Sequence, residues 1–181
     1  NNIMNFEKKW KKESSSVFYQ NKKNDILEIN KKNIAFLRKK KNLINKKSRV
    51  CSHLNSSSKI HEMIIFHKKG AYVRPHKHLN RFESFNLIFG EIDIILFNYL
   101  GKPIKKIIMG TYSTGKTFYY RMQKPFFHTL IIKSDSLFQE ITSGPFDPKD
   151  TLKAKWSPDE FNKKEISKYL TKLNIMSKKI N

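Results

Sequence analysis

The sequence predicts a mainly β domain, a barrel or a sandwich of antiparallel strands. From about residue 49 to residue 145, short apolar and aromatic segments alternate with turn residues such as Lys69-Gly70, Gly90 and Thr114-Gly115. The separations are too short for helical crossovers, so the strands must pair mainly antiparallel. Many short strands at even spacing are typical of a sandwich or barrel. The length of 181 residues suits one domain with a self-sufficient core and extra terminal elements.

The expected strands follow the apolar segments between these turns. They cover Glu62–Phe66, Tyr72–Arg74, Glu83–Phe89, Asp93–Phe97, Ile104–Met109, Thr117–Arg121, His128–Ile132 and Leu137–Thr142. The run 92–97 is apolar on both faces, as expected where one sheet packs on another. The pattern divides the chain into an N-terminal extension (1–48), a barrel (49–146) and a C-terminal tail (147–181).

Each terminal region is expected to hold a helix. In the extension, Asn30 is placed to cap a short helix with Ile34 and Leu37 on one side. In the tail, Ser157 is the expected N-cap and Pro158 the first helical residue. Apolar residues at helical spacing follow, namely Ile166, Tyr169, Leu170 and Leu173.

The composition is strongly basic, with 37 Lys and Arg against 15 Asp and Glu and a formal net charge of +22. A positive charge of this size is typical of proteins that bind nucleic acids. Nearly all the cations are Lys, however, whereas Arg is the residue that binds phosphates and bases bidentately. The lysines also accompany many Asn and Ile, a mix that an AT-rich coding sequence produces. We therefore expect no specific nucleic-acid partner.

Two further features bear on the compartment. The single cysteine, Cys51, cannot form an internal disulfide, which favours a reducing environment. No apolar run is long enough to span a membrane, and no signal-peptide core follows the first residue. The expectation is a cytoplasmic protein without a membrane partner.

One group of residues has the spacing of a metal-binding site. His76 and His78 are two residues apart, so in extended chain both imidazoles point to the same face. A short turn then returns the chain, so that Glu83 at the start of the next strand can supply an oxygen ligand. His128 adds a third imidazole from a distant strand. Three His and one carboxylate leave coordination positions open, as in a catalytic site, for one divalent ion: Fe, Mn, Ni or Zn.

Each part of this pattern is weak alone. A His-x-His pair on a strand is more often surface polarity, and an isolated His128 is more often a hydrogen-bonded core residue. The joint spacing, with Gly70 and Gly90 at its two ends, favours the metal site. It resembles the first cupin motif, G-x5-H-x-H-x4-E-x6-G, at every fixed position. His128 matches the second motif, but Gln123-Lys124-Pro125 stands where that motif has Pro-x-Gly.

The resemblance implies a cupin double-stranded β-helix, a jelly-roll barrel. More narrowly, the chain is similar to the WbuC family of cupin-fold metalloproteins, although Gln139-Glu140 stands where that family often has His-Glu. The matching stretches are residues 72–78, Glu83-Ser84-Phe85, residues 118–121, His128-Thr129, Gly144-Pro145-Phe146 and Trp156-Ser157-Pro158. The family resemblance implies a metal-binding protein, often encoded among genes for surface-polysaccharide synthesis, with no known reaction.

The remaining site hypotheses concern the cavity. Arg74 and Arg121 are candidates for binding an anionic, sugar-derived small molecule; for Arg74 a salt bridge on the barrel rim is an equal alternative. Because Glu83 is expected to bind the metal, the general base of a reaction would be Tyr120, Glu62 or a water molecule on the ion. Glu62 could also accept a hydrogen bond from a ligand imidazole.

Two function classes remain open. The first is an enzyme acting on a sugar or nucleotide-sugar intermediate, either an isomerase or epimerase-like activity or an Fe(II) oxygenase. The second is a non-catalytic, metal-dependent binding or sensing module. A homodimer paired through sheet edges is expected in either case.

Overall fold

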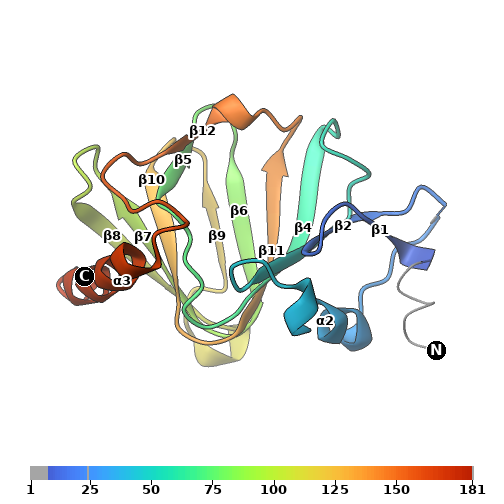
Figure 1. Cartoon of the computed structure of the whole chain (residues 1–181), viewed down its shortest axis with the longest axis horizontal. Coiled ribbons are helices and arrows are strands. Elements are labelled where there is room, and N and C mark those ends of the chain that lie inside the picture. The colour runs from blue at the N-terminus through green and yellow to red at the C-terminus, as the bar shows by residue number, and fades with distance from the viewer. Residues whose placement is uncertain (1–7, 24, 181) are drawn as a thin grey trace.

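Two β-sheets face each other in the computed structural model, which describes residues 8–23 and 25–180 (Figure 1). The larger sheet has, in spatial order, β1 (Trp10–Lys12), β2 (Val17–Gln20), β3 (Lys47–Cys51), β4 (Ile60–His67), β11 (Ser136–Ser143), β6 (Glu83–Phe89) and β9 (Tyr119–Met122). The smaller has β12 (Thr151–Lys153), β5 (His76–His78), β10 (Phe127–Ile132), β7 (Ile92–Phe97) and β8 (Pro103–Met109). The predicted mainly β, double-sheet jelly roll is confirmed.

Nearly all strand pairs are antiparallel, as the short connections predicted. The parallel pair is β2 with β3, in the register Val17↔Arg49. A parallel pair needs a long crossover, and here the connection holds the helix α2 (Lys31–Leu37) and the 3-10 turn η1 (Lys40–Asn42). The N-terminal extension therefore adds two strands to the larger sheet.

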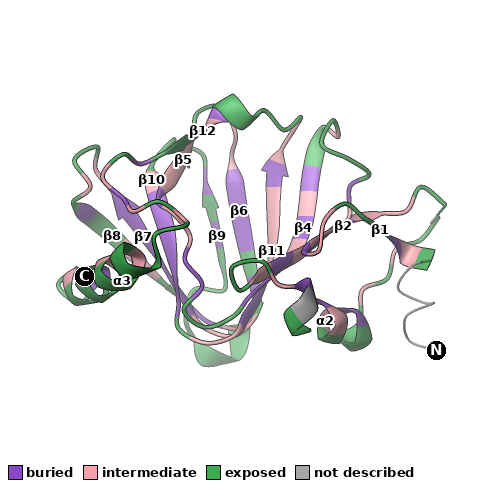
Figure 2. Ribbon diagram, in the orientation of Figure 1, coloured by how far each residue is buried: buried purple, intermediate pink, exposed green. Residues whose placement is uncertain are grey.

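The main core lies between the sheets, where Figure 2 shows the strands largely buried. It is formed mostly by aromatic and branched side chains from both sheets, including Met63, Ile65, Phe85, Leu87, Ile92, Ile94, Leu130, Ile132 and Phe138. All six residues of β7 are buried. The outer side of this strand is covered by α3 (Lys163–Ser177), where Leu173 packs with Ile95, Phe97 and Ile131. This explains why the run 92–97 is apolar on both faces.

The helices α2 and α3 differ in how well local sequence predicted them. Asn30 caps α2 as expected, since its side chain accepts hydrogen bonds from the amides of Lys32 and Asn33. The predicted start of the C-terminal helix at Ser157 is wrong. The Ser157 hydroxyl donates to the Ala154 carbonyl at 2.8 Å, and α3 begins only after Asn162, whose side chain accepts from the Glu165 amide.

The expected strand at Tyr72–Arg74 is likewise reduced, to one bridge between Tyr72 and Ile131. The strand that forms is β5, which carries the two histidines of the motif. The remaining 3-10 turns are η2 (Tyr112–Thr114) and η3 (Pro148–Asp150). No helix among the described residues is long and apolar enough to cross a membrane.

The glycines at both ends of the His-Glu motif have a backbone reason. Gly70 and Gly90 have φ of 69° and 94°, values that favour glycine. Gly90 follows the last residue of β6 and lies close to the start of β11. A Cβ at this position would collide with the Ser136 hydroxyl and the Asp135 carbonyl oxygen. These glycines shape the turns on either side of β5 and β6, which carry the candidate ligands.

Candidate metal centre and its cavity

Strand pairing brings the four predicted ligands together. β5 lies antiparallel to β10, with His76 directly opposite His128, and His78 follows on the same face of β5. Glu83 begins β6 in the facing sheet. One ligand atom from each of these four residues lies within 4.8 Å of all the others. The side chain of His128 is fully buried and that of Glu83 is 4% exposed.

Backbone carbonyls orient two of the imidazoles. The Nδ1 of His76 lies 2.8 Å from the Arg74 carbonyl oxygen, and the Nδ1 of His128 lies 3.0 Å from that of Phe126. A carbonyl can only accept, so each Nδ1 carries the proton and each Nε2 is left with its lone pair. This is the tautomer a metal ligand needs.

The third imidazole is held by side chains. His78 Nδ1 lies 3.1 Å from the Thr151 hydroxyl, and its Nε2 lies 3.2 Å from Glu83 Oε2. Arg81 donates to the same Thr151 hydroxyl at 2.7 Å and is itself anchored on Asp150 at 2.6 Å. On the far side of the centre, the Tyr120 hydroxyl donates to Glu83 Oε1 at 3.1 Å.

The donor set fits a divalent cation. His128 Nε2 is buried without a hydrogen-bond partner in the described structure and lies 3.2 Å from Glu83 Oε1. A buried lone pair facing a carboxylate is unfavourable unless a proton or a cation lies between them. Burial alone would raise the pKa of Glu83, but the imidazoles of His128 and His78 hold it well below its ordinary value. Glu83 is therefore ionised, and it raises the pKa of His128 against the effect of burial.

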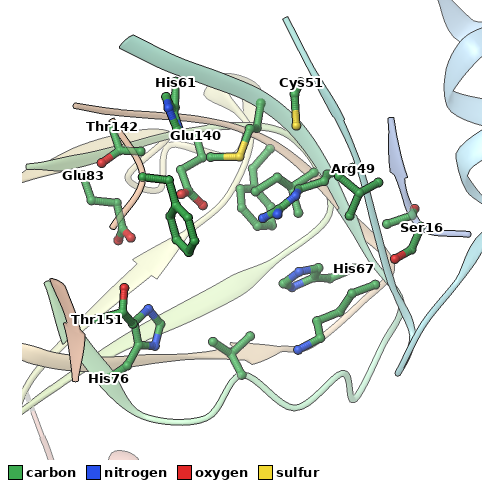
Figure 3. A pocket seen from close by; sticks show the side chains of 18 of the residues that line it. Ser16, Arg49, Cys51, His61, His67, His76, Glu83, Glu140, Thr142 and Thr151 are labelled. Carbon is green, nitrogen blue, oxygen red and sulfur yellow. The ribbon is translucent and has the colours of Figure 1, made fainter. Parts of the chain in front are cut away.

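A cavity of about 670 Å³ extends from this centre through the barrel to β2 and β3 (Figure 3). That volume is in the range of small-molecule sites. Part of its wall is apolar, with Phe85, Leu130 and Phe138. Among its polar residues is Glu140, whose side chain makes no hydrogen bond within the described residues. Burial, followed by the charge of Glu83, raises the pKa of Glu140 to about 8.

The other predicted site residues take different places. Tyr120 faces the centre. Glu62 does not, because it pairs with Ile141 on the opposite face of β4 from the cavity residues His61 and Met63. Its backbone amide donates to His53 Nδ1 instead, so it is not brought to the imidazoles.

The two predicted substrate-binding arginines also lie outside the residues that line the cavity. Arg74 donates to Asp159 at 2.8 Å, which is the rim salt bridge considered above. Arg121 pairs with Ser84 on the outer face of β6, and its guanidinium lies 3.9 Å from the ring centroid of Phe82. The arginines that do line the cavity are Arg49 and Arg81, and sequence reasoning missed both of them together with Glu140. Strand alternation was the available signal, but it does not tell which face turns inward.

Comparisons with known proteins agree with this fold. The structure of CapF, a capsular polysaccharide assembling protein from Staphylococcus aureus, is similar with a TM-score of 0.51 and 16% identity over 61% of this chain. A CapF structure with the inhibitor 3-isopropenyl-tropolone gives 0.50, also at 16% identity over 61% of this chain. The match covers 32% of the CapF chain in both cases, so this chain spans about a third of its length.

The fold is that of a cupin. A variant of oxalate decarboxylase from Bacillus subtilis also matches, with a TM-score of 0.45 and 17% identity over 59% of this chain and 27% of that one. A family model described as a domain of unknown function, DUF6016, matches residues 35–109 of this chain. No curated protein matches the sequence significantly.

Proposed function

We propose that this cupin binds one divalent metal ion and acts on a small sugar or nucleotide-sugar intermediate of surface-polysaccharide synthesis. The observation that carries the proposal is the meeting of His76, His78, Glu83 and His128 in the lining of one cavity. The sugar context is supported by the resemblance to the WbuC family, to which we assign the chain. The similarity of its fold to CapF is compatible with that context.

The metal would be held by three imidazole nitrogens and one carboxylate oxygen, a set suited to Fe, Mn, Ni or Zn. The chemistry that such an ion would supply there is polarisation of a carbonyl or hydroxyl oxygen of the substrate, with oxygen chemistry as a further option for iron. The Arg74 and Phe126 carbonyls fix two imidazole tautomers. Arg81 and Thr151 hold His78 from behind.

The chain's own residues divide the remaining work. Tyr120 keeps its hydroxyl proton, because burial and the charge of Glu83 raise its pKa, and it orients Glu83 by hydrogen bonding. Phe85 and Phe138 exclude water from the wall beside the centre. Glu140 lies on the same inward face of the larger sheet, opposite Phe85. We assign to its carboxyl group the proton-transfer role first proposed for Glu62.

Elemental analysis of the purified full chain tests the metal centre. The parent should hold about one metal ion per chain, and the double variant His76→Ala, His128→Ala should hold none. His53→Ala is the matched control, since His53 also lines the cavity but stacks on His61 at a centroid distance of 4.2 Å, apart from the four ligands. No metal in the parent, even after reloading with Fe(II), Mn(II), Ni(II) and Zn(II), overturns the proposal.

Turnover separates the two function classes. Incubation of the loaded protein with nucleotide sugars, followed by mass spectrometry and chromatography of isomers, should reveal a product. Metal-dependent binding without any product would establish the non-catalytic binding or sensing module instead. We also propose a cytoplasmic homodimer, paired through sheet edges; light scattering coupled to size exclusion measures that mass directly, and a monomer mass would refute it.

A further inference from the structure

Three nitrogen-bearing side chains line the cavity wall away from the metal centre. Lys47 and Arg49 belong to β3 and His67 to β4. Lys47 lies directly opposite His67, and Arg49 lies opposite Ile65. Residues two apart on a strand, and residues opposite each other in a pair, share one face of the sheet. Since Ile65 belongs to the core between the sheets, all three nitrogen-bearing side chains face inward.

Figure 3 shows this arrangement, with Arg49 and His67 on one side of the cavity and His76, Glu83 and Thr151 on the other. All of these residues line the same cavity of about 670 Å³. A single small molecule can therefore reach both the metal centre and the wall formed by β3 and β4.

These three side chains have hydrogen-bonding groups that no other described residue uses: donors on Lys47 and Arg49, and a ring nitrogen on His67. Arg49 Nε and His67 Nδ1 are buried without a hydrogen-bond partner in the part of the chain that the structure describes. Lys47 Nζ donates to the Tyr72 carbonyl at 3.1 Å, which leaves two of its three N–H groups. Buried donors are normally paired, so unpaired ones in a cavity wall indicate a missing acceptor.

The cations also lack a carboxylate in direct contact among the described residues. Glu13, Glu140 and Glu160 line the cavity, yet within residues 8–23 and 25–180 no carboxylate comes within ion-pair distance, 4.0 Å, of Lys47 or Arg49. Two like charges on one face of a strand repel each other, most of all where water is partly excluded. Arg81, by contrast, has its carboxylate at 2.6 Å.

We propose that Lys47, Arg49 and His67 form a subsite for an oxyanion, a phosphate or a carboxylate, on the small molecule that reaches the metal centre. The guanidinium fork suits the planar or tetrahedral oxygens of these groups, and the ammonium adds a point charge. The link between the two ends rests on the proposed function; the anion subsite itself does not. It transfers the anion-binding role from Arg74 and Arg121, which lie outside the cavity lining, to Arg49.

Calorimetry with simple anions tests the subsite. Inorganic phosphate, sulfate and acetate are titrated separately, at constant ionic strength, into the full chain after its metal has been removed by chelation and dialysis. Arg49→Gln should weaken binding of the preferred anion about tenfold or more, because a charge-assisted hydrogen bond is lost. Arg49→Lys keeps the charge without the fork, and Lys47→Gln tests the neighbouring cation. Arg38→Gln, which removes an exposed guanidinium, is the matched control and should stay within about twofold of the parent.

The outcomes separate this inference from the proposed function. Metal-free parent that binds phosphate or acetate, and loses that binding in Arg49→Gln and Lys47→Gln but not in Arg38→Gln, supports the subsite; the better-bound probe names its class. Equal binding in Arg49→Gln and parent, anion binding only after metal is restored, or no binding of any of the three probes overturns it. A parent that takes up no metal but binds phosphate through Arg49 leaves the subsite standing while the metal proposal fails. Circular dichroism of every variant confirms that folded proteins are compared.

Discussion

His67 makes the wall of the cavity sensitive to acid. Its ring is 7% exposed and lies edge-on to Phe138, with 5.2 Å between ring centroids. Burial, together with the charges of Lys47 and Arg49, lowers the pKa of His67 from 6.5 to about 3. The folded chain thus keeps this imidazole neutral at pH values where the unfolded chain protonates it.

The sign of the effect follows from proton binding. Below its ordinary pKa of 6.5 the unfolded state takes up a proton at His67, whereas the folded state does so only near pH 3. The free energy of unfolding must therefore fall as the pH falls through this window. At about pH 5 the loss from this single group is about 2 kcal/mol relative to about pH 8. The figure barely changes while the folded pKa stays under about 4, because the folded state is then almost unprotonated at that pH.

The variant His67→Gln removes the titrating group and keeps a polar side chain. Urea unfolding of metal-free parent and variant, followed by far-ultraviolet circular dichroism, gives the free energy of unfolding at about pH 5 and about pH 8. Cationic buffers are used, since phosphate or carboxylate buffers would occupy the proposed anion subsite. The difference between the two pH values should be about 2 kcal/mol smaller in His67→Gln than in the parent.

Met63→Gln is the control, because Met63 lies on the same inward face of β4. It should lower stability at both pH values by the same amount and leave the difference unchanged. An equal pH difference in the parent and in His67→Gln would refute the reasoning. It would mean that His67 titrates near its ordinary pKa in the folded state.

Three further predictions concern the frame around the site. Gly90→Ala should lower the free energy of unfolding by about 2 kcal/mol or more, because φ is 94° and the new methyl would meet Ser136; urea unfolding showing a change under about 0.5 kcal/mol contradicts this. Leu173→Ala should lower the free energy of unfolding by about 3 kcal/mol, because Leu173 is 2% exposed and its loss leaves a cavity under α3. Ile175→Ala is the control and should change stability little, because Ile175 is 57% exposed. Equal losses of stability for the two variants in thermal melts would contradict this prediction. Burial raises the pKa of Cys51 to about 12. Its alkylation by iodoacetamide at about pH 8 should therefore be about a thousandfold slower in the folded chain than in the urea-unfolded chain. Comparable rates of alkylation, measured by mass spectrometry, would contradict this prediction.

The candidate metal ligands were open to prediction because their geometry is mostly local. Two histidines at positions i and i+2 share a face in any extended strand, and a short turn is enough to bring Glu83 near them. Strands β5 and β6 form as this spacing requires. His128 lies far along the chain, and its likeness to the second cupin motif supplied what spacing alone could not.

The rest of the cavity could not be read in the same way. Glu62 and Glu140 are both carboxylates in predicted strands, yet Glu62 faces away from the cavity and Glu140 faces into it. Arg121 and Arg49 differ in the same manner. Alternation makes a one-residue change of phase reverse every side chain, and the phase is set by pairing with strands distant in sequence.

The start of the C-terminal helix also depends on tertiary contacts that local sequence does not reveal. Ser157-Pro158 has the residues of a helix start, but Trp156 packs on Phe97 with 4.9 Å between ring centroids, and the Tyr72 hydroxyl donates to the Pro158 carbonyl at 2.9 Å. These tertiary contacts hold the segment in turns, and the helix begins at the next available cap, Asn162. Local propensity was a weak prior here because long-range packing competed with it.

The sequence alone was enough to predict the antiparallel β class, the turns at Gly70 and Gly90, and a local cluster of candidate metal ligands. Each of these depends on residues close together in the chain, whose relative directions follow from backbone periodicity. Only the tertiary structure decided that Arg49, Lys47 and His67 face the candidate metal centre across one cavity. The packing of the two sheets determines which face of each strand is buried, and this packing depends on residues far apart in the sequence.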